Sequence, residues 1–171
     1  MAVTVLVPIQ RFDYAFSSLC LCHRFNQPVA TLSRMVSRSG DGPLYLLFGL
    51  LAWVFDRQQG GQVFGLGLLA FLLELPVYLL LKNTFKRNRP AQLPSFIQPS
   101  DQYSLPSGHT AAAFLMASLI SSFYPAAAWL VWPWAFLIGF SRVLLGVHFI
   151  TDIVAGALLG MMCFAVVKGA I

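Results

Sequence analysis

Charged residues are scarce in this 171-residue chain, where Asp, Glu, Lys and Arg together make up only 10% of the sequence. Soluble globular proteins carry about 25% charged residues, whereas 58% of this chain is hydrophobic. The composition therefore excludes an ordinary soluble protein and predicts an integral membrane protein. The length is that of one domain, since domains commonly run about 100–200 residues.

Cysteine is also rare, with only Cys20, Cys22 and Cys163 in the chain. The fragment Cys20-Leu21-Cys22-His23 lacks the four ligands at characteristic spacings that a zinc site needs, so we predict no metal or other cofactor and interpret these cysteines as apolar packing. The net charge of +5 is not gathered into a basic stripe on a polar domain. We therefore predict anionic lipid headgroups, and no nucleic acid, as partners.

Hydrophobic runs are what the sequence has in abundance. Lipid offers no hydrogen-bond partners to a free backbone, so runs that cross it must be helical. We predict an all-α, polytopic helical bundle with about five spans, the first of which is short for about 30 Å of hydrocarbon. The five runs are Pro43–Phe55, Gly61–Leu81, Thr110–Tyr124, Ala126–Phe140 and Phe149–Val167.

Small and polar residues inside these runs carry further information. Gly61–Gly65 and Gly156–Gly160 have the GxxxG spacing that allows two helices to pack closely. Glu74 is an acid within a predicted span and so a functional candidate by default. We interpret it instead as part of a kink at Pro76 with a buried hydrogen bond, for example to a tyrosine.

The first 42 residues differ from the rest. Residues 11–42 mix polar and apolar positions and contain no run long enough to span a bilayer. We predict one or two amphipathic helices lying on the membrane surface; the alternative is a disordered leader. Ser39–Gly42 breaks the pattern, so we divide the chain into an interfacial segment (1–42) and a transmembrane domain (43–171).

Alternating spans bring the polar residues of the chain to one membrane face. If Gly61–Leu81 ends on that face, the next span begins there, and the chain returns to it between the last two spans. The long connection from Lys82 to Ser107 lies on the same side and is too long to be idle in so small a protein. The residues gathered in this way are Lys82, Arg89, Ser107, His109, Arg142, His148 and Asp152.

These side chains suit a phosphate group. Lys82, Arg89 and Arg142 can neutralise a dianion, and the guanidinium fork offers paired donors to phosphate oxygens. Ser107 is a good helix N-cap after Pro106, and the start of a helix presents free N–H groups to an anion. The Gly108 N–H adds a donor that no side chain obstructs.

Two histidines can divide the chemistry of phosphoryl transfer. His148 and Asp152 are four residues apart and would share a helix face, so the carboxylate can orient the ring as a nucleophile or base. His109 is then free to protonate a leaving oxygen. The alternatives are a core histidine for His109, a structural ion pair for His148 with Asp152, and interfacial anchors for the cations.

Three segments resemble the motifs of a known family. Lys82–Pro90 matches KxxxxxxRP, Pro106–His109 matches PSGH, and Ser141–Asp152 matches SRxxxxxHxxxD. In this order and spacing they resemble the type 2 phosphatidic acid phosphatase (PAP2) superfamily, and the resemblance covers about residues 43–168. Many membrane members have six spans, and here the amphipathic leader stands in place of the first.

The resemblance implies a metal-independent membrane lipid phosphatase with a PAP2-like core. His148 would form a phosphohistidine, Asp152 would orient it, and His109 would protonate the leaving group. The phosphoryl oxygens would be held by Lys82, Arg89, Ser107, Gly108 and Arg142.

Several choices stay open at this stage. The candidate substrates are undecaprenyl diphosphate, phosphatidylglycerol phosphate and phosphatidic acid, and neither the substrate nor the oligomeric state follows from the sequence. A lipid phosphotransferase would use the same residues; a non-enzymatic scaffold or transporter is the alternative from another class, and the hydropathy argues against a soluble vanadate haloperoxidase.

The membrane orientation is also open. We predict a multi-pass protein of the inner membrane. Nine cations lie on the site face and two on the other, which by the positive-inside rule favours a cytoplasmic site. Bacterial family precedent instead predicts a periplasmic, outward-facing site, and we follow it.

Overall fold

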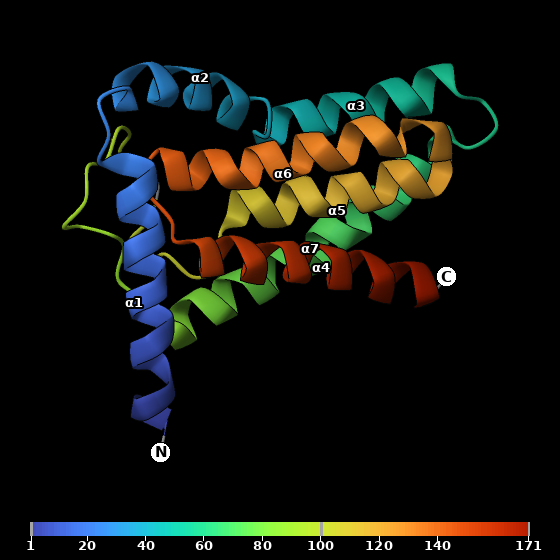
Figure 1. Cartoon of the computed structure of the whole chain (residues 1–171). Helices are drawn as coiled ribbons and strands as arrows, with labels where there is room; N and C mark the ends of the chain where they lie inside the picture. Colours follow the sequence, from blue (N-terminus) through green and yellow to red (C-terminus); the bar gives the residue numbers. More distant parts are fainter. Residues whose placement is uncertain (1, 100, 171) are drawn as a thin grey trace.

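The computed structural model describes residues 2–99 and 101–170, and within these ranges every regular element is helical. This confirms the predicted all-α fold. The long helices of the chain run side by side as a bundle, while its first helix crosses one end of the bundle (Figure 1). The elements are α1 (Ala2–Leu21), α2 (Asn26–Arg38), α3 (Gly42–Phe55), α4 (Gly60–Phe85), α5 (Gly108–Phe123), the 3₁₀ turn η1 (Pro125–Ala127), α6 (Ala128–Leu144) and α7 (Ile150–Ala170).

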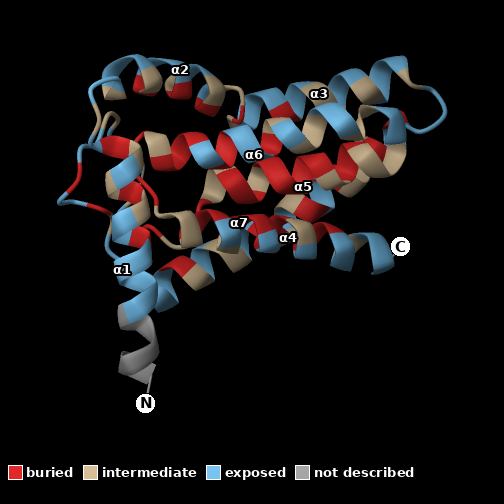
Figure 2. Ribbon diagram, in the orientation of Figure 1, coloured by how far each residue is buried: buried red, intermediate tan, exposed pale blue. Residues whose placement is uncertain are grey.

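Helix α5 is the centre of the bundle and packs against α4, α6 and α7, as the buried residues in Figure 2 show. Its contact with α7 is the most extensive between any two helices. A Cβ atom on Gly160 would lie 2.1 Å from the carbonyl oxygen of Ala111, and one on Gly156 would lie 2.5 Å from that of Ser107. The packing role predicted for this glycine pair is confirmed.

The other glycine pair does not mediate a tight helix contact. A Cβ atom on Gly65 would meet open space, and one on Gly61 would meet only an ordinary contact with Trp53. The GxxxG prediction is therefore wrong for α4, because this face of the helix points away from the rest of the bundle.

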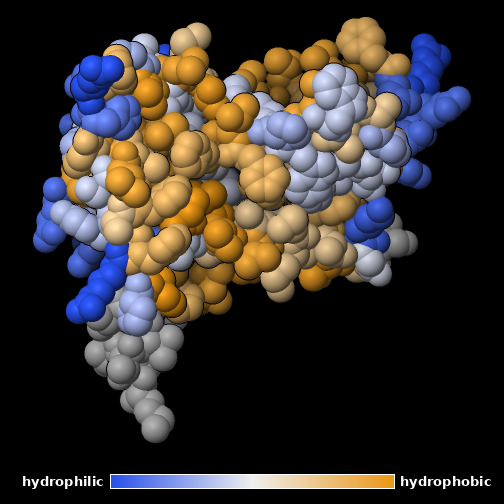
Figure 3. Space-filling model, in the orientation of Figure 1, coloured by the Kyte–Doolittle hydropathy of each residue, from blue (hydrophilic) through white to orange (hydrophobic). Residues whose placement is uncertain are grey.

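Within residues 2–99 and 101–170, three helical segments are long and apolar enough to cross a membrane: α4, η1 with α6, and α7. Helix α5 is apolar but has only 16 residues. At 1.5 Å per residue the 14-residue α3 extends about 21 Å, short of the roughly 30 Å hydrocarbon core. The hydrophobic surface runs across the middle of the molecule with polar atoms at its two ends (Figure 3). The count of five spans stays a prediction.

The N-terminal segment forms two helices that differ in their relation to the bundle. Helix α1 crosses the bundle end, whereas α2 packs along α6 and is followed by α3 on the same side of the bundle (Figure 1). Helix α2 buries Ala30, Ser33 and Ser37. The predicted break at Ser39–Gly42 coincides with the junction of α2 and α3, where Gly42 is the first residue of α3. The position of α1 on the membrane surface remains a prediction.

Helix α4 continues without interruption through Pro76. Glu74 is buried, but no hydrogen bond to its side chain forms within the described residues. The predicted tyrosine partner is absent because the hydroxyl of Tyr78, one turn further along, contacts Asp101 and Lys82 instead.

Candidate active site

The structure places the predicted site residues at one end of the bundle. Lys82 lies in the last turn of α4 and Ser107 immediately precedes α5. Arg142 lies in the last turn of α6 and Asp152 in the first turn of α7. Lys86–Ser107 connects α4 with α5 across this end, as the helix ends in Figure 1 show.

Two predicted phosphate ligands share one carboxylate. Lys82 Nζ lies 2.7 Å from Asp101 Oδ2, while Arg89 pairs with the other carboxylate oxygen and donates from Nε to the Asp101 carbonyl at 3.1 Å. Burial would raise the pKa of Asp101, but the hydrogen bonds from Lys82, Tyr78 and Arg89 outweigh it and lower the pKa to about 2. An anion thus already bridges the two cations for which we predicted phosphate oxygens.

The burial of Lys82 and Arg142 bears on the alternative that they are interfacial anchors. Their exposed fractions are 4% and 5%, whereas an anchor extends its charged end into the headgroup layer. Both cations are directed inward, where an unpaired charge is costly and a bound anion would offset the cost.

His148 reaches the site from the turn between α6 and α7. Gly146, two residues earlier, has φ +73°, and a Cβ atom there would lie 2.1 Å from the carbonyl oxygen of Pro94. Glycine alone fits this left-handed position without a side-chain clash. The turn leaves His148 only 3% exposed, with Nε2 at 3.5 Å from Arg89 Nη1.

The predicted helical pairing of His148 with Asp152 is wrong in detail, because α7 begins at Ile150. The two side chains still face each other, since Asp152 Oδ2 accepts the N–H of Phe149 at 2.8 Å and so closes the turn before the helix. The separation from His148 Nδ1 to Asp152 Oδ2 is 3.7 Å. This exceeds hydrogen-bonding distance, so the coupling is electrostatic.

The buried ring of His148 is neutral at pH 7. Desolvation by burial lowers its pKa to about 4, Asp152 opposes this shift, and the nearby charges of Arg89 and Arg142 add to it. A neutral imidazole has a free nitrogen lone pair, which a nucleophile requires.

Arg87 holds Asp152 and is itself paired with Asp13; neither Arg87 nor Asp13 was among the predicted site residues. Arg87 Nη1 donates to Asp152 Oδ1 at 2.7 Å, and its other terminal nitrogen pairs with Asp13 of α1. Asp13 also accepts hydrogen bonds from the backbone and hydroxyl of Thr151, and both carboxylates are 0% exposed. The available signal was a carboxylate in a mainly cationic interfacial segment, because a carboxylate needs a partner when it is buried.

The start of α5 departs in part from the predicted anion site. Ser107 precedes the helix as predicted, but its hydroxyl makes no cap hydrogen bond and instead accepts from the Thr110 hydroxyl at 2.9 Å. A Cβ atom on Gly108 would lie 3.1 Å from the ring of Tyr78, so this glycine also allows Tyr78 to pack closely. His109 Nε2 lies 3.1 Å from Asp41 Oδ1, at the junction of α2 and α3.

Arg142 connects the turn of His148 with α2. Its carbonyl oxygen accepts the His148 N–H at 3.3 Å, and Nη1 donates to Ser37 Oγ at 2.7 Å. Its Nε is buried without a hydrogen-bond partner among the described residues. Arg142 and His109 line a polar pocket of about 210 Å³ with residues of α2.

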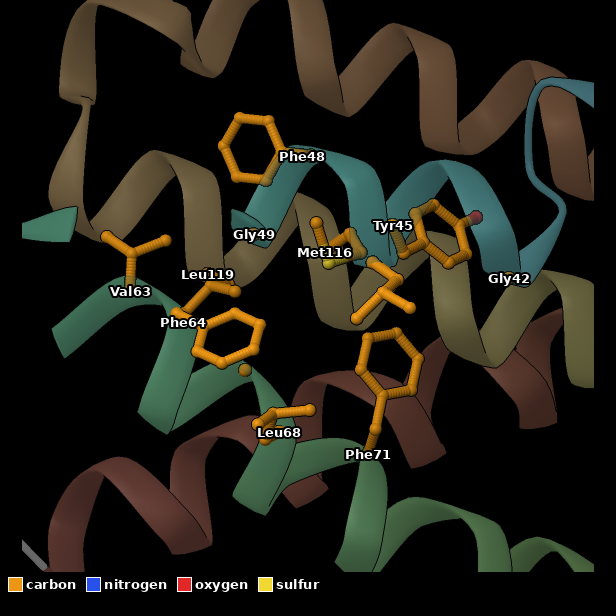
Figure 4. Close-up of a pocket in the computed structure, with 12 residues that line it drawn as sticks. Gly42, Tyr45, Phe48, Gly49, Val63, Phe64, Leu68, Phe71, Met116 and Leu119 are labelled. Atoms are coloured by element: carbon orange, nitrogen blue, oxygen red, sulfur yellow. The ribbon is translucent and has the colours of Figure 1, made fainter. Parts of the chain in front are cut away.

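A second pocket, of about 220 Å³, lies between α3, α4 and α5 (Figure 4). Gly42, next to Asp41, lines one end of it, and Val63 of α4 lies at the other. Its walls are almost entirely apolar, with Phe48, Phe64 and Phe71 among them. It therefore suits a hydrocarbon chain better than a polar ligand.

The apolar surface and all-helical bundle define a membrane protein. Residues 62–170 match the PAP2 superfamily, and the chain belongs to this family. It is therefore, by class, a membrane lipid phosphatase.

Relatives and solved structures agree with this assignment. Phosphatidylglycerophosphatase B of Bacillus subtilis is 28% identical over 94% of this chain and 84% of its own length. The bacitracin transport permease protein BcrC of Bacillus licheniformis is 30% identical over 69% of this chain and 61% of its own length. The crystal structure of Aquifex aeolicus LpxE superposes with a TM-score of 0.77 at 28% identity, covering 92% of this chain and 95% of that one.

Proposed function

We propose that the chain hydrolyses a phosphate or diphosphate monoester of a membrane lipid through a phosphohistidine on His148. The observation that carries the proposal is the position of this buried, neutral imidazole, with Nε2 at 3.5 Å from Arg89, whose guanidinium shares a carboxylate with Lys82. A phosphoryl group in place of that carboxylate would meet both cations and the nucleophile. We place the protein in the inner membrane with the site facing outward.

The reaction takes two steps. Nε2 of His148 attacks phosphorus, the bond to the leaving oxygen breaks, and that oxygen keeps the electron pair and takes a proton from His109. Water then attacks the phosphohistidine, gives its proton to His109, and releases phosphate with the nitrogen lone pair restored. Lys82, Arg89, Ser107, Gly108 and Arg142 hold the phosphoryl oxygens, and Asp152 stabilises the charged ring.

The lipid tail would lie in the apolar pocket between α3, α4 and α5. Gly42 at its end adjoins Asp41, which contacts His109, so a chain attached to a headgroup at the site can reach the pocket. With its tail in this apolar pocket, the lipid can stay in the membrane while its headgroup reacts at the site.

The test is phosphate release by the purified protein in detergent with EDTA present. Undecaprenyl diphosphate, phosphatidylglycerol phosphate and phosphatidic acid are offered in parallel. We expect activity that survives EDTA, disappears in His148→Ala, and leaves an acid-labile phosphoryl group on the wild-type protein after rapid quenching. Activity retained by a folded His148→Ala variant would overturn the proposal.

The alternatives give different outcomes in the same assay. A phosphotransferase would form the phosphohistidine but yield a second phosphorylated lipid when an acceptor lipid is added. A non-enzymatic scaffold or transporter would release no phosphate from any lipid.

A further inference from the structure

The polar pocket beside His109 carries an excess of positive charge. Three arginines line it, Arg34 and Arg38 from α2 and Arg142 from α6, against the single carboxylate of Asp41. The formal charge of these four side chains is +2, and the protonated His109 that the proposed first step needs would add to it. Because low-dielectric walls strengthen such a field, the pocket attracts anions.

The pocket also contains unused hydrogen-bond donors. Arg142 is only 5% exposed, and its Nε has no hydrogen-bond partner among the described residues. Arg34 donates one hydrogen bond to the Phe96 carbonyl at 3.0 Å, and neither Arg34 nor Arg38 forms an ion pair within the described part of the chain. Buried donors are almost always satisfied in folded proteins, so Arg142 Nε calls for an acceptor that a ligand brings. The half-buried Arg34 and the exposed Arg38 have free donors that can bind the same ligand.

The location of the pocket relates this acceptor to the reaction. His109, which we propose protonates the leaving oxygen, lines the pocket. The group bonded to the leaving oxygen therefore lies in or next to it. Arg142 also serves the scissile phosphoryl group, but a plain alcohol or diacylglycerol has no use for the further cations Arg34 and Arg38 at this point, whereas an anionic leaving group does.

We propose that this pocket binds a second phosphate group of the substrate, on the leaving side of the scissile bond. The chain would then act on a lipid diphosphate, or on a lipid with a phosphodiester beside its terminal phosphate, in preference to a lipid monophosphate. A diphosphate fits the geometry well, because its second phosphorus is bonded directly to the leaving oxygen next to His109. The inference rests on the proposed hydrolysis and specifies its substrate class.

The competing explanation is that Arg34 and Arg38 only attract anionic lipid headgroups to α2. Such anchoring would change the activity towards every membrane lipid alike. A substrate-binding role changes the ratio of activities between substrates with and without the second phosphate, so this ratio separates the two explanations.

The experiment measures initial kcat/KM for farnesyl diphosphate, farnesyl monophosphate and phosphatidylglycerol phosphate in detergent. We expect Arg38→Gln and Arg34→Gln each to lower the diphosphate-to-monophosphate ratio about tenfold, equivalent to one charged hydrogen bond. Arg38→Lys should retain part of the ratio, because it keeps the charge and loses only the paired donors. Arg24→Gln is the matched control, an exposed cation between α1 and α2 outside the pocket.

The outcomes are distinguishable from failure of the proposed function. No hydrolysis of any substrate by the wild-type protein would refute the phosphatase itself. Hydrolysis with an unchanged ratio in folded Arg34→Gln and Arg38→Gln variants would refute the second-phosphate pocket alone. A larger loss for phosphatidylglycerol phosphate than for farnesyl diphosphate would assign the pocket to a phosphodiester, and the reverse to a diphosphate.

Discussion

His148 and Asp152 are buried at the site. A chain of ion pairs leads from Asp152 to residues outside the predicted site. Asp152 is held by Arg87, which is held in turn by Asp13 of α1. Each carboxylate is fully buried, and buried charges persist only when paired. The orientation of the proposed nucleophile thus depends on a residue 135 positions earlier in the chain than His148.

The first residue-scale prediction concerns pH. Because burial lowers the pKa of His148 to about 4, the ring stays unprotonated well below the ordinary histidine value. We expect the acid limb of kcat/KM against pH to have its midpoint near 4 rather than 6.5. A midpoint near 6.5 in the free enzyme would contradict a buried nucleophile.

The same shift has a consequence for stability. Between pH 6.5 and 4 the unfolded chain takes up a proton at His148 and the folded chain does not, so stability falls as the pH falls through this window. Asp101 acts at lower pH: its folded pKa of about 2 means that its stabilisation, present above its ordinary value of 3.8, is lost as the pH falls towards 2. Thermal unfolding at a series of pH values measures both.

A second residue-scale prediction concerns Asp13→Asn. The change removes a buried charge and leaves Arg87 with Asp152 alone, while the amide can still accept one hydrogen bond from Thr151. We expect a loss of about 1–3 kcal/mol in stability and a lower kcat, because Asp152 is less restrained. The exposed Arg11→Gln on the same helix is the control. An unchanged melting temperature and kcat in Asp13→Asn would show that the pair has no structural role.

At the scale of elements, the α4–α5 connection and the α2–α3 junction bring two carboxylates to the site. Asp101 bridges Lys82 and Arg89, and Asp41 contacts His109. The three sequence motifs lie at the helix ends that converge on the site, and they include neither Asp41 nor Asp101. The hydrophobic runs predicted five of the helices, because they depend only on local composition, and the alternation of spans predicted their common end. The long-range partners depend on how loops fold back, which the sequence pattern does not encode.

The case of Gly146 makes the same distinction. The sequence spacing predicted that His148 would be near Asp152, and the structure has the two side chains 3.7 Å apart. A left-handed turn at Gly146, rather than a helix, brings the two side chains together. Glycine is needed there because Pro94, 52 residues earlier, leaves no room for a side chain. Such a contact could not be read from the motif alone.

The element-scale prediction is that Asp101 competes with phosphate. Its carboxylate pairs with the two cations that a phosphate dianion would need. A ligand must displace this carboxylate, so the apparent affinity for the ligand is reduced to the fraction of protein in which the carboxylate has moved away. We expect Asp101→Asn to lower the inhibition constant of inorganic phosphate by about tenfold. If Asp101 instead serves to position Lys82 and Arg89, the inhibition constant will rise. The measurement is competitive inhibition by inorganic phosphate of the hydrolysis of a soluble phosphate ester, followed through the release of its alcohol.

At the scale of the whole molecule, the apolar pocket and the polar site form adjoining compartments. The pocket lies within the hydrophobic part of the bundle and the site at its end. Leu46, half-exposed on the pocket wall, allows this arrangement to be tested. We expect Leu46→Trp to raise KM for a long-chain lipid several-fold and to leave a short-chain phosphate ester unaffected. Equal effects on both substrates would place the tail elsewhere.

The last prediction concerns which side of the membrane carries the site. Nine of the eleven cations lie at the site end, but Lys82, Arg87 and Arg89 are held in ion pairs and Arg142 is buried. Setting these four aside leaves five cations against two, so the positive-inside rule still favours a cytoplasmic site. The outward-facing orientation follows the bacterial precedent instead and needs a direct test.

Two single-cysteine proteins test the orientation. The exposed Cys22 lies between α1 and α2 at the site end, and Arg57 lies in the α3–α4 turn at the other end (Figure 1). One protein keeps Cys22 with Cys20→Ser and Cys163→Ser; the other replaces all three cysteines with serine and carries Arg57→Cys. For an outward-facing site, we expect a membrane-impermeant maleimide to label Cys22 in intact spheroplasts and to label the Arg57→Cys protein only after lysis. The reverse pattern would place phosphate release in the cytoplasm, and the substrate would then have to be a lipid of the inner leaflet.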